Sequence, residues 1–153
     1  MTRDVKRPIG EMIVAEALTW VGTPYRHQGS QRGVGCDCLG LVRGVWLSIY
    51  RREAERPGPY APDWAEANGG DALLDAARRH CREKACVDMQ PGDLLVFRWR
   101  ADAPAKHAGI LVAANRFIHA YQGHAVLVSA LAPQWARRIA GVFEFPSSLT
   151  QGS

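Results

Sequence analysis

Gly35-Cys36-Asp37-Cys38-Leu39-Gly40-Leu41-Val42 is the stretch in which a turn-forming segment gives way to a predicted helix. Asp37 is a good N-cap residue, so the helix is expected to carry Cys38 in its first turn. The partial positive charge at a helix start favours the thiolate, which is the form of cysteine that attacks carbonyl groups. Cys38 is therefore a candidate nucleophile.

Two stripes run along the predicted helix that begins at Cys38. The apolar stripe includes the thiol position and consists of Cys38, Leu41, Val42, Val45 and Ile49. A neighbouring stripe of small residues consists of Gly40, Gly44 and Ser48. Glycine inside a helix costs about 1 kcal/mol relative to alanine, so close packing against another element is expected on this side.

The rest of the chain reads as helices followed by strands. Amphipathic spacing predicts a helix over residues 10–21 and another over residues 71–84, the latter with Cys81 on one side. Short apolar runs between turn signals predict strands at residues 94–99, 107–112, 117–121, 125–129 and 139–145. This order indicates an α+β fold, with N-terminal helices packed on an antiparallel sheet built from the C-terminal half. The 153 residues are expected to form a single domain.

Two histidines, His107 and His119, lie in neighbouring predicted strands far downstream of Cys38. If the hairpin turns so that Leu111 lies opposite Asn115, then His107 lies opposite His119, with Cβ atoms about 4.5–5.5 Å apart. A change of register by one residue would break this pairing. In such a site Cys38 is the nucleophile, His107 is the base and His119 orients the His107 ring.

Charge and hydropathy exclude several classes of protein. The net charge of +4 is spread over pairs such as Arg51-Arg52, Arg78-Arg79 and Arg137-Arg138, a pattern unlike that of a dedicated nucleic-acid binder. A solvated basic surface is the ordinary interpretation, and weak attraction to an anionic cell-wall polymer is the alternative. Residues 1–10 lack an apolar run long enough for a signal peptide, and no later run suits membrane insertion. We expect a protein made in the cytoplasm, and a role outside the cell would require export by a route that does not use a signal peptide.

The four cysteines fit neither a zinc site nor a disulfide framework well. Cys36 and Cys38 have one residue between them, whereas zinc ligands are usually paired two to four residues apart. His80 and Cys81 add possible ligands, so a zinc-stabilised module remains an alternative. A structural disulfide is disfavoured in a reducing cytosol. We expect no metal and no cofactor, with Cys36 either a buried small residue or an oxidation partner of Cys38.

Five short motifs follow one another along the chain: Thr23-Pro24-Tyr25-Arg26, Asp37-Cys38-Leu39-Gly40-Leu41-Val42, Pro91-Gly92-Asp93-Leu94, His107-Ala108-Gly109-Ile110 and Ile118-His119-Ala120. In this order they resemble the NlpC family of papain-like bacterial cell-wall peptidases. The resemblance covers roughly residues 11–145 and implies a papain-like fold. It also implies a thiol protease with Cys38, His107 and His119 as catalytic residues. Tyr25 would then stabilise the oxyanion together with the Cys38 backbone N–H, with Asp37 in support; Tyr25 as a packing residue is the alternative.

The sequence Arg26-His27-Gln28, followed by Gly33-Val34-Gly35-Cys36-Asp37-Cys38, most resembles the NlpC subgroup that is carried by tailed phages and gene transfer agents. That resemblance implies an enzyme associated with a tail particle and partnered by tail proteins. It implies cleavage of peptidoglycan stem peptides, commonly between γ-D-glutamate and a diamino acid, through a thioester. Alternatives are a catalytically inactive structural tail protein and related thiol chemistry, such as an amidase, thioesterase or acyltransferase.

The chain departs from many relatives at two positions of these motifs. Gln28-Gly29 stands where many have Gly-Gly, and Leu39 stands where many have Ser. Residues 51–64 are rich in proline and charge and are expected to loop over the surface. Two aromatic residues of this segment, Tyr60 and Trp64, are expected either to line a substrate groove or to pack against the rest of the protein.

Overall fold

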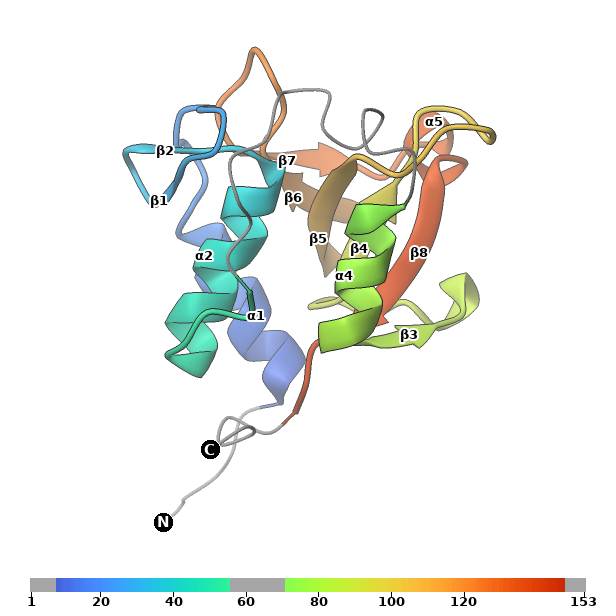
Figure 1. Ribbon diagram of the computed structural model, residues 1–153, viewed down its shortest axis with the longest axis horizontal. Helices are drawn as coiled ribbons and strands as arrows, with labels where there is room; N and C mark the ends of the chain where they lie inside the picture. Colours follow the sequence, from blue (N-terminus) through green and yellow to red (C-terminus); the bar gives the residue numbers. More distant parts are fainter. Residues whose placement is uncertain (1–7, 56–70, 148–153) are drawn as a thin grey trace.

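The computed structural model describes residues 8–55 and 71–147, in which helices precede a sheet (Figure 1). Tyr60 and Trp64 lie outside these residues. The elements in chain order are α1 (Ile9–Leu18), β1 (Ser30–Gln31), β2 (Gly35–Cys36), α2 (Cys38–Tyr50), α4 (Ala72–His80), β3 (Arg82–Lys84), the 3-10 turn η1 (Cys86–Asp88), β4 (Leu94–Phe97), β5 (His107–Ala113), β6 (Arg116–His119), β7 (Leu127–Ala130), α5 (Pro133–Ala136) and β8 (Ile139–Glu144). The predicted α+β fold is confirmed.

The main sheet has six strands in the order β3-β8-β4-β5-β6-β7, and each neighbouring pair is antiparallel. Strands β4 to β8 occupy the five predicted strand regions, with ends that differ by no more than two residues. The predicted turn Pro91-Gly92-Asp93 precedes β4. Gly92 has a φ of 100° there, and a Cβ at this position would lie 2.4 Å from the Cα of Gly10, so the start of α1 packs directly on the turn.

The prediction of a helix over residues 71–84 was wrong over its last four residues. Helix α4 ends at His80, and Cys81 is already extended, with φ −132° and ψ 163°. Residues Arg82–Lys84 form the edge strand β3, which pairs with β8. The Arg82 side chain pairs with Glu144 on that strand. A pairing with a strand some sixty residues away thus overrides the local helical pattern.

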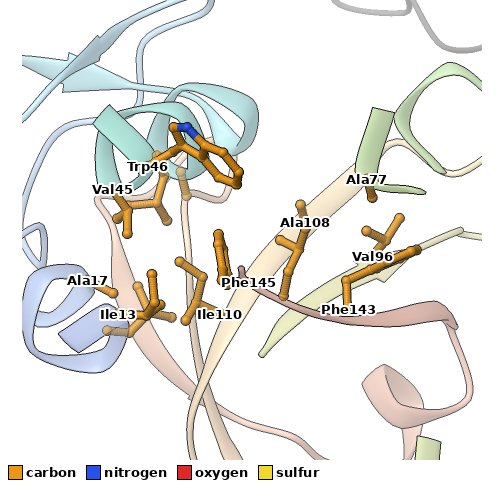
Figure 2. Packing of buried hydrophobic residues seen from close by; sticks show 14 of the residues in the cluster. Ile13, Ala17, Val45, Trp46, Ala77, Val96, Ala108, Ile110, Phe143 and Phe145 are labelled. Carbon is orange, nitrogen blue, oxygen red and sulfur yellow. The ribbon is translucent and has the colours of Figure 1, made fainter. Parts of the chain in front are cut away.

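The main hydrophobic core lies between the helices and one face of the sheet (Figure 2). Side chains from α1, α2 and α4 meet those of the central strands there, including Ile13, Ala17, Val45, Trp46, Ala77, Val96, Ala108, Ile110 and Phe143. A second, smaller cluster, consisting of Leu95, Phe97, Leu111, Phe117 and Val142, lies apart from the first and packs against Trp135 of α5. Because side chains alternate along a strand, the two clusters take alternate residues of β4 and β5.

The small-residue stripe of α2 is the surface on which other elements come close, as predicted. A Cβ at Gly40 would lie 1.6 Å from the carbonyl oxygen of Gly29. A Cβ at Gly44 would lie 2.2 Å from the ring of Trp20, which follows α1. Glycine at these positions lets the loop before α2 and the end of α1 pack onto the helix.

No helix within residues 8–55 and 71–147 combines the length and the apolar character needed to cross a lipid bilayer.

Candidate active site

Asp37 fixes the start of α2 and the loop that precedes it. One carboxylate oxygen accepts a hydrogen bond from the backbone N–H of Gly40 at 2.8 Å, which confirms the predicted N-cap. The other accepts from the backbone N–H of Gln28, also at 2.8 Å. The side chain is buried, with 4% exposed. A single carboxylate therefore holds the loop and the first turn of the helix together, with Cys38 at the junction.

The Cys38 thiol lies against the beginning of β5. Its Sγ is 3.9 Å from the carbonyl oxygen of Lys106, the residue before His107. Burial, and then the Asp37 carboxylate, raise the pKa of Cys38 to about 12, although hydrogen bonds from the Ala108 and Leu39 backbone act in the opposite direction. The helix start was expected to favour the thiolate. Desolvation and a buried carboxylate outweigh that effect here, so the resting site holds a neutral thiol.

His107 and His119 meet as predicted, but through a different register. The ladder pairs Ile110 with Ile118 and Leu111 with Phe117, so Leu111 does not lie opposite Asn115. Nε2 of His107 lies 2.8 Å from Nδ1 of His119. The register differs from the expected one by two residues, which keeps every side chain on its predicted face.

Ser129 extends this pair and was missed in the sequence. Its Oγ lies 2.8 Å from Nε2 of His119. Ser129 belongs to β7, which pairs with β6 so that His119 lies opposite Leu127 and Phe117 opposite Ser129. Ser129 is thus the diagonal neighbour of His119 on the same face. Knowledge of the β6–β7 register would have revealed it, but nothing in the local sequence marks this serine.

The three groups have one proton arrangement in which His107 can act as a base. Its Nε2 faces His119, so Nδ1 is the nitrogen left to take a proton and must be unprotonated. Nε2–H of His107 then donates to Nδ1 of His119, and Nε2–H of His119 donates to the Ser129 hydroxyl oxygen. A base role for His107 therefore requires this one tautomer of each ring.

Both imidazoles are buried in an aromatic environment. The His107 ring stacks on Trp99 at 5.5 Å between centroids and 24° between planes, and Trp135 lies 5.6 Å away. Burial, and then the neighbouring His119, lower the pKa of His107 to about 3. Burial, and then His124, lower the pKa of His119 to about 4. Both rings are therefore neutral near pH 7, the form in which His107 can accept a proton.

Tyr25 lies on the loop side of the same site. It forms a parallel β-bridge with Cys36, two residues before the thiol. Burial raises the pKa of Tyr25 to about 12, and the further contributors are Cys38, Asp37 and Cys36. The phenol therefore keeps its proton and can donate a hydrogen bond close to Cys38.

The remaining cysteines form no disulfide with Cys38. All four are free in the structure; Cys36 is fully buried, Cys81 is half-buried and Cys86 is exposed. Burial, and then Asp37, raise the pKa of Cys36 to about 12, which keeps it a thiol. Within residues 8–55 and 71–147, no three His, Cys, Asp or Glu side chains are grouped so that they could hold a metal ion.

A thiol at a helix start lies against the beginning of the strand that carries His107 of the imidazole pair, and the helices pack on an antiparallel sheet. These features define a protein of the papain-like class. The model of the NlpC/P60 family matches residues 22–144. The chain belongs to this family.

Relatives and solved structures agree with this placement. The chain is 31% identical over 138 residues to a gamma-DL-glutamyl hydrolase of Bacillus subtilis, covering 87% of this chain and 29% of the relative. It is 31% identical over 140 residues to a probable endopeptidase of Haemophilus influenzae, covering 86% and 76%. The NlpC/p60 domain of the peptidoglycan hydrolase SagA superposes with a TM-score of 0.62 at 27% identity, covering 89% of this chain and 98% of that domain. The chain thus spans less than a third of the first relative and about three quarters of the second.

Proposed function

We propose that this protein is a cysteine endopeptidase that hydrolyses stem peptides of bacterial peptidoglycan, with Cys38 as nucleophile. The observation that carries the proposal is the hydrogen-bonded series His107–His119–Ser129, which begins one residue after Lys106, whose carbonyl oxygen lies 3.9 Å from Sγ of Cys38. A neutral, oriented imidazole beside a thiol is the arrangement that nucleophilic catalysis by cysteine requires.

The geometry supports the following sequence of steps. Nδ1 of His107 takes the proton of the Cys38 thiol as the sulfur attacks the carbonyl carbon. The backbone N–H of Cys38 and the Tyr25 hydroxyl donate hydrogen bonds to the oxyanion that forms. His107 then protonates the departing amine, which leaves a thioester on Cys38. Water, deprotonated by His107, hydrolyses the thioester and restores the thiol.

The neutral resting state shapes the first step. Because the pKa of Cys38 is about 12 and that of His107 about 3, a preformed thiolate–imidazolium pair is disfavoured. Proton transfer is therefore coupled to attack on the substrate. Asp37 supports the nucleophile by holding the helix start, while its charge opposes early loss of the thiol proton.

The bond between γ-D-glutamate and a diamino acid is the proposed site of cleavage. The name of the Bacillus subtilis relative, a gamma-DL-glutamyl hydrolase, supports a γ-glutamyl bond. The resemblance of residues 26–38 to the subgroup of tailed phages and gene transfer agents supports a tail-associated enzyme with tail proteins as partners. A catalytically inactive tail protein is the second candidate, and the raised pKa of the Cys38 thiol is the observation that favours it.

Digestion of defined muropeptides, with products weighed by mass spectrometry, tests the proposal. The wild-type protein should release a new amine and a new carboxyl group at the γ-glutamyl bond. Cys38→Ala should abolish hydrolysis while circular dichroism shows an unchanged fold, because no other group replaces the thiolate. Cys86→Ala, at an exposed cysteine, is the matched control and should keep full activity. Hydrolysis by the Cys38→Ala protein would show that the nucleophile lies elsewhere.

Metal content separates this proposal from the zinc-stabilised module. The enzyme should be blocked by iodoacetamide at Cys38, should need reducing conditions and should be indifferent to EDTA. A structural zinc protein would retain stoichiometric metal through purification and would unfold when the metal is chelated. Elemental analysis with circular dichroism in EDTA decides between them.

A further inference from the structure

An open cleft of about 610 Å³ lies at the end of the sheet where β4 ends and β8 begins. Its lining is Arg98, Trp99, Arg100, Ala101, Arg137, Arg138 and Ile139. Four of these seven residues are arginines and none is acidic. The lining therefore has one sign of charge, which attracts anionic groups.

The arginines of the cleft fall into two pairs. Arg98 and Arg100 each have a carboxylate partner, Asp71 at 3.4 Å and Asp102 at 3.3 Å. Among the described residues no carboxylate pairs with Arg137 or Arg138. Arg137 ends α5 and is exposed, and the Arg138 guanidinium lies over the Trp99 ring, 5.6 Å from its centroid. These two guanidinium groups are available to an anion from outside.

Trp99 connects the cleft with the proposed catalytic base. One contact of its ring is the Arg138 guanidinium, and another is the stacked His107 ring at 5.5 Å. The unpaired Arg138 guanidinium is thus separated from the His107 imidazole by a single aromatic ring. A substrate group bound by this guanidinium would therefore belong to a residue close to the scissile bond.

We propose that the Arg137/Arg138 cleft binds a free carboxylate of the peptide substrate and so selects acidic stem peptides over amidated ones. The inference rests on the proposed function and adds a specificity site to it. A guanidinium presents two parallel N–H donors that match a carboxylate, whereas an amide offers a single oxygen and no charge.

Pairs of synthetic stem peptides that differ at a single carboxyl group, free or amidated, test the cleft. One pair varies the α-carboxyl of the glutamate and the other varies the carboxyl of the diamino acid. For one of these pairs, wild-type kcat/KM should favour the free acid by about tenfold or more. Arg138→Gln should reduce this ratio to near one, mostly through KM. Arg138→Lys should keep part of the preference, and Arg78→Gln, which removes one exposed charge from α4, should keep all of it.

The possible outcomes distinguish a failure of the cleft proposal from a failure of the proposed peptidase function. Equal rates on the acid and amide members of both pairs, or an undiminished preference in Arg138→Gln, would overturn the cleft proposal while leaving the peptidase intact. Arg138→Gln could instead lose rate only on whole cell walls, with no difference between acid and amidated peptides. This result would also overturn the cleft proposal, because the bound anion would then be a wall polymer. If the wild-type protein cleaves no peptide, calorimetry on the Cys38→Ala protein still tests the cleft. Tighter binding of the acid peptide, lost in Cys38→Ala/Arg138→Gln, supports it, and equal binding of acid and amide contradicts it.

Discussion

At the scale of single residues, the environment of Cys38 differs from that suggested by its position at a helix start. The dipole of the first turn favours a thiolate, but burial and the Asp37 carboxylate raise the pKa of Cys38 to about 12. The same aspartate is needed to cap the helix and to anchor Gln28. The residue that positions the proposed nucleophile is therefore also one that favours its protonated form.

In the proposed mechanism His119 and Ser129 act through His107 as positioning residues, and the effects of substituting them should follow a definite order. Replacing His107 should cost several orders of magnitude in kcat, because the base itself is lost. His119→Asn or His119→Gln should cost less than His119→Ala, since either amide can still accept from Nε2–H of His107. Ser129→Ala should lower kcat by roughly tenfold with little change in KM, and Ser129→Thr should restore it, because the hydroxyl accepts from Nε2–H of His119 in the arrangement that lets His107 act as a base.

Steady-state kinetics across pH measure these effects. A purely structural Ser129 would change stability without lowering kcat, and Thr would then give no specific rescue. Equal activity of wild type and His107→Ala would show that a different base is used.

At the scale of elements, α2 depends on the glycines that let other segments approach it. The Cβ of Gly44→Ala would lie 2.2 Å from the Trp20 ring. Overpacking of this kind typically costs 1–3 kcal/mol, more than the gain of about 1 kcal/mol in helix propensity. We expect Gly44→Ala to lower the free energy of unfolding, as measured by urea denaturation.

Ser48→Ala is the matched control, because Ser48 lies one turn further along the same stripe and is exposed. It should be neutral or slightly stabilising. In the double variant Gly44→Ala/Trp20→Phe, the smaller ring relieves the clash, so the combined loss should be less than the sum of the two single losses. Additive losses would mean that the Gly44–Trp20 contact is not the source of the effect.

At the scale of the whole molecule, the buried histidine pair makes stability depend on pH. The pKa of His107 is lowered to about 3 and that of His119 to about 4, whereas both rings titrate near 6.5 when unfolded. Below about pH 6.5 the unfolded chain therefore binds protons that the folded protein does not, and stability falls as the pH is lowered toward about 4. Each histidine can contribute up to about 1.4 kcal/mol per pH unit.

Urea denaturation between about pH 7 and about pH 5 isolates this effect, because most carboxylates remain ionised there. The wild-type free energy of unfolding should decrease across this window. The double variant His107→Gln/His119→Gln should show a flatter profile. Parallel profiles for the two proteins would show that other groups cause the pH dependence.

Local sequence patterns determined much of this protein: the α+β order, the five strand regions β4 to β8, the N-cap at Asp37 and the candidate trio Cys38, His107 and His119. Each depends on spacing or chemistry within a few residues, which is why a single sequence reveals them. The side chains of β5 and β6 that share a face of the sheet were also predictable, because a register shift of two residues leaves each side chain on the same face.

The tertiary structure alone decided features that join distant parts of the chain. Residues Arg82–Lys84 are a strand because β8 offers an edge, and Ser129 completes the imidazole series because β7 pairs with β6 in one register. The neutral state of the thiol and of both rings follows from burial, which depends on what every other element packs against. Arg138, just before β8, and Trp99, just after β4, came together in the same way. Such neighbours are separated by many residues along the chain, so only the folded chain brings them within reach of one another.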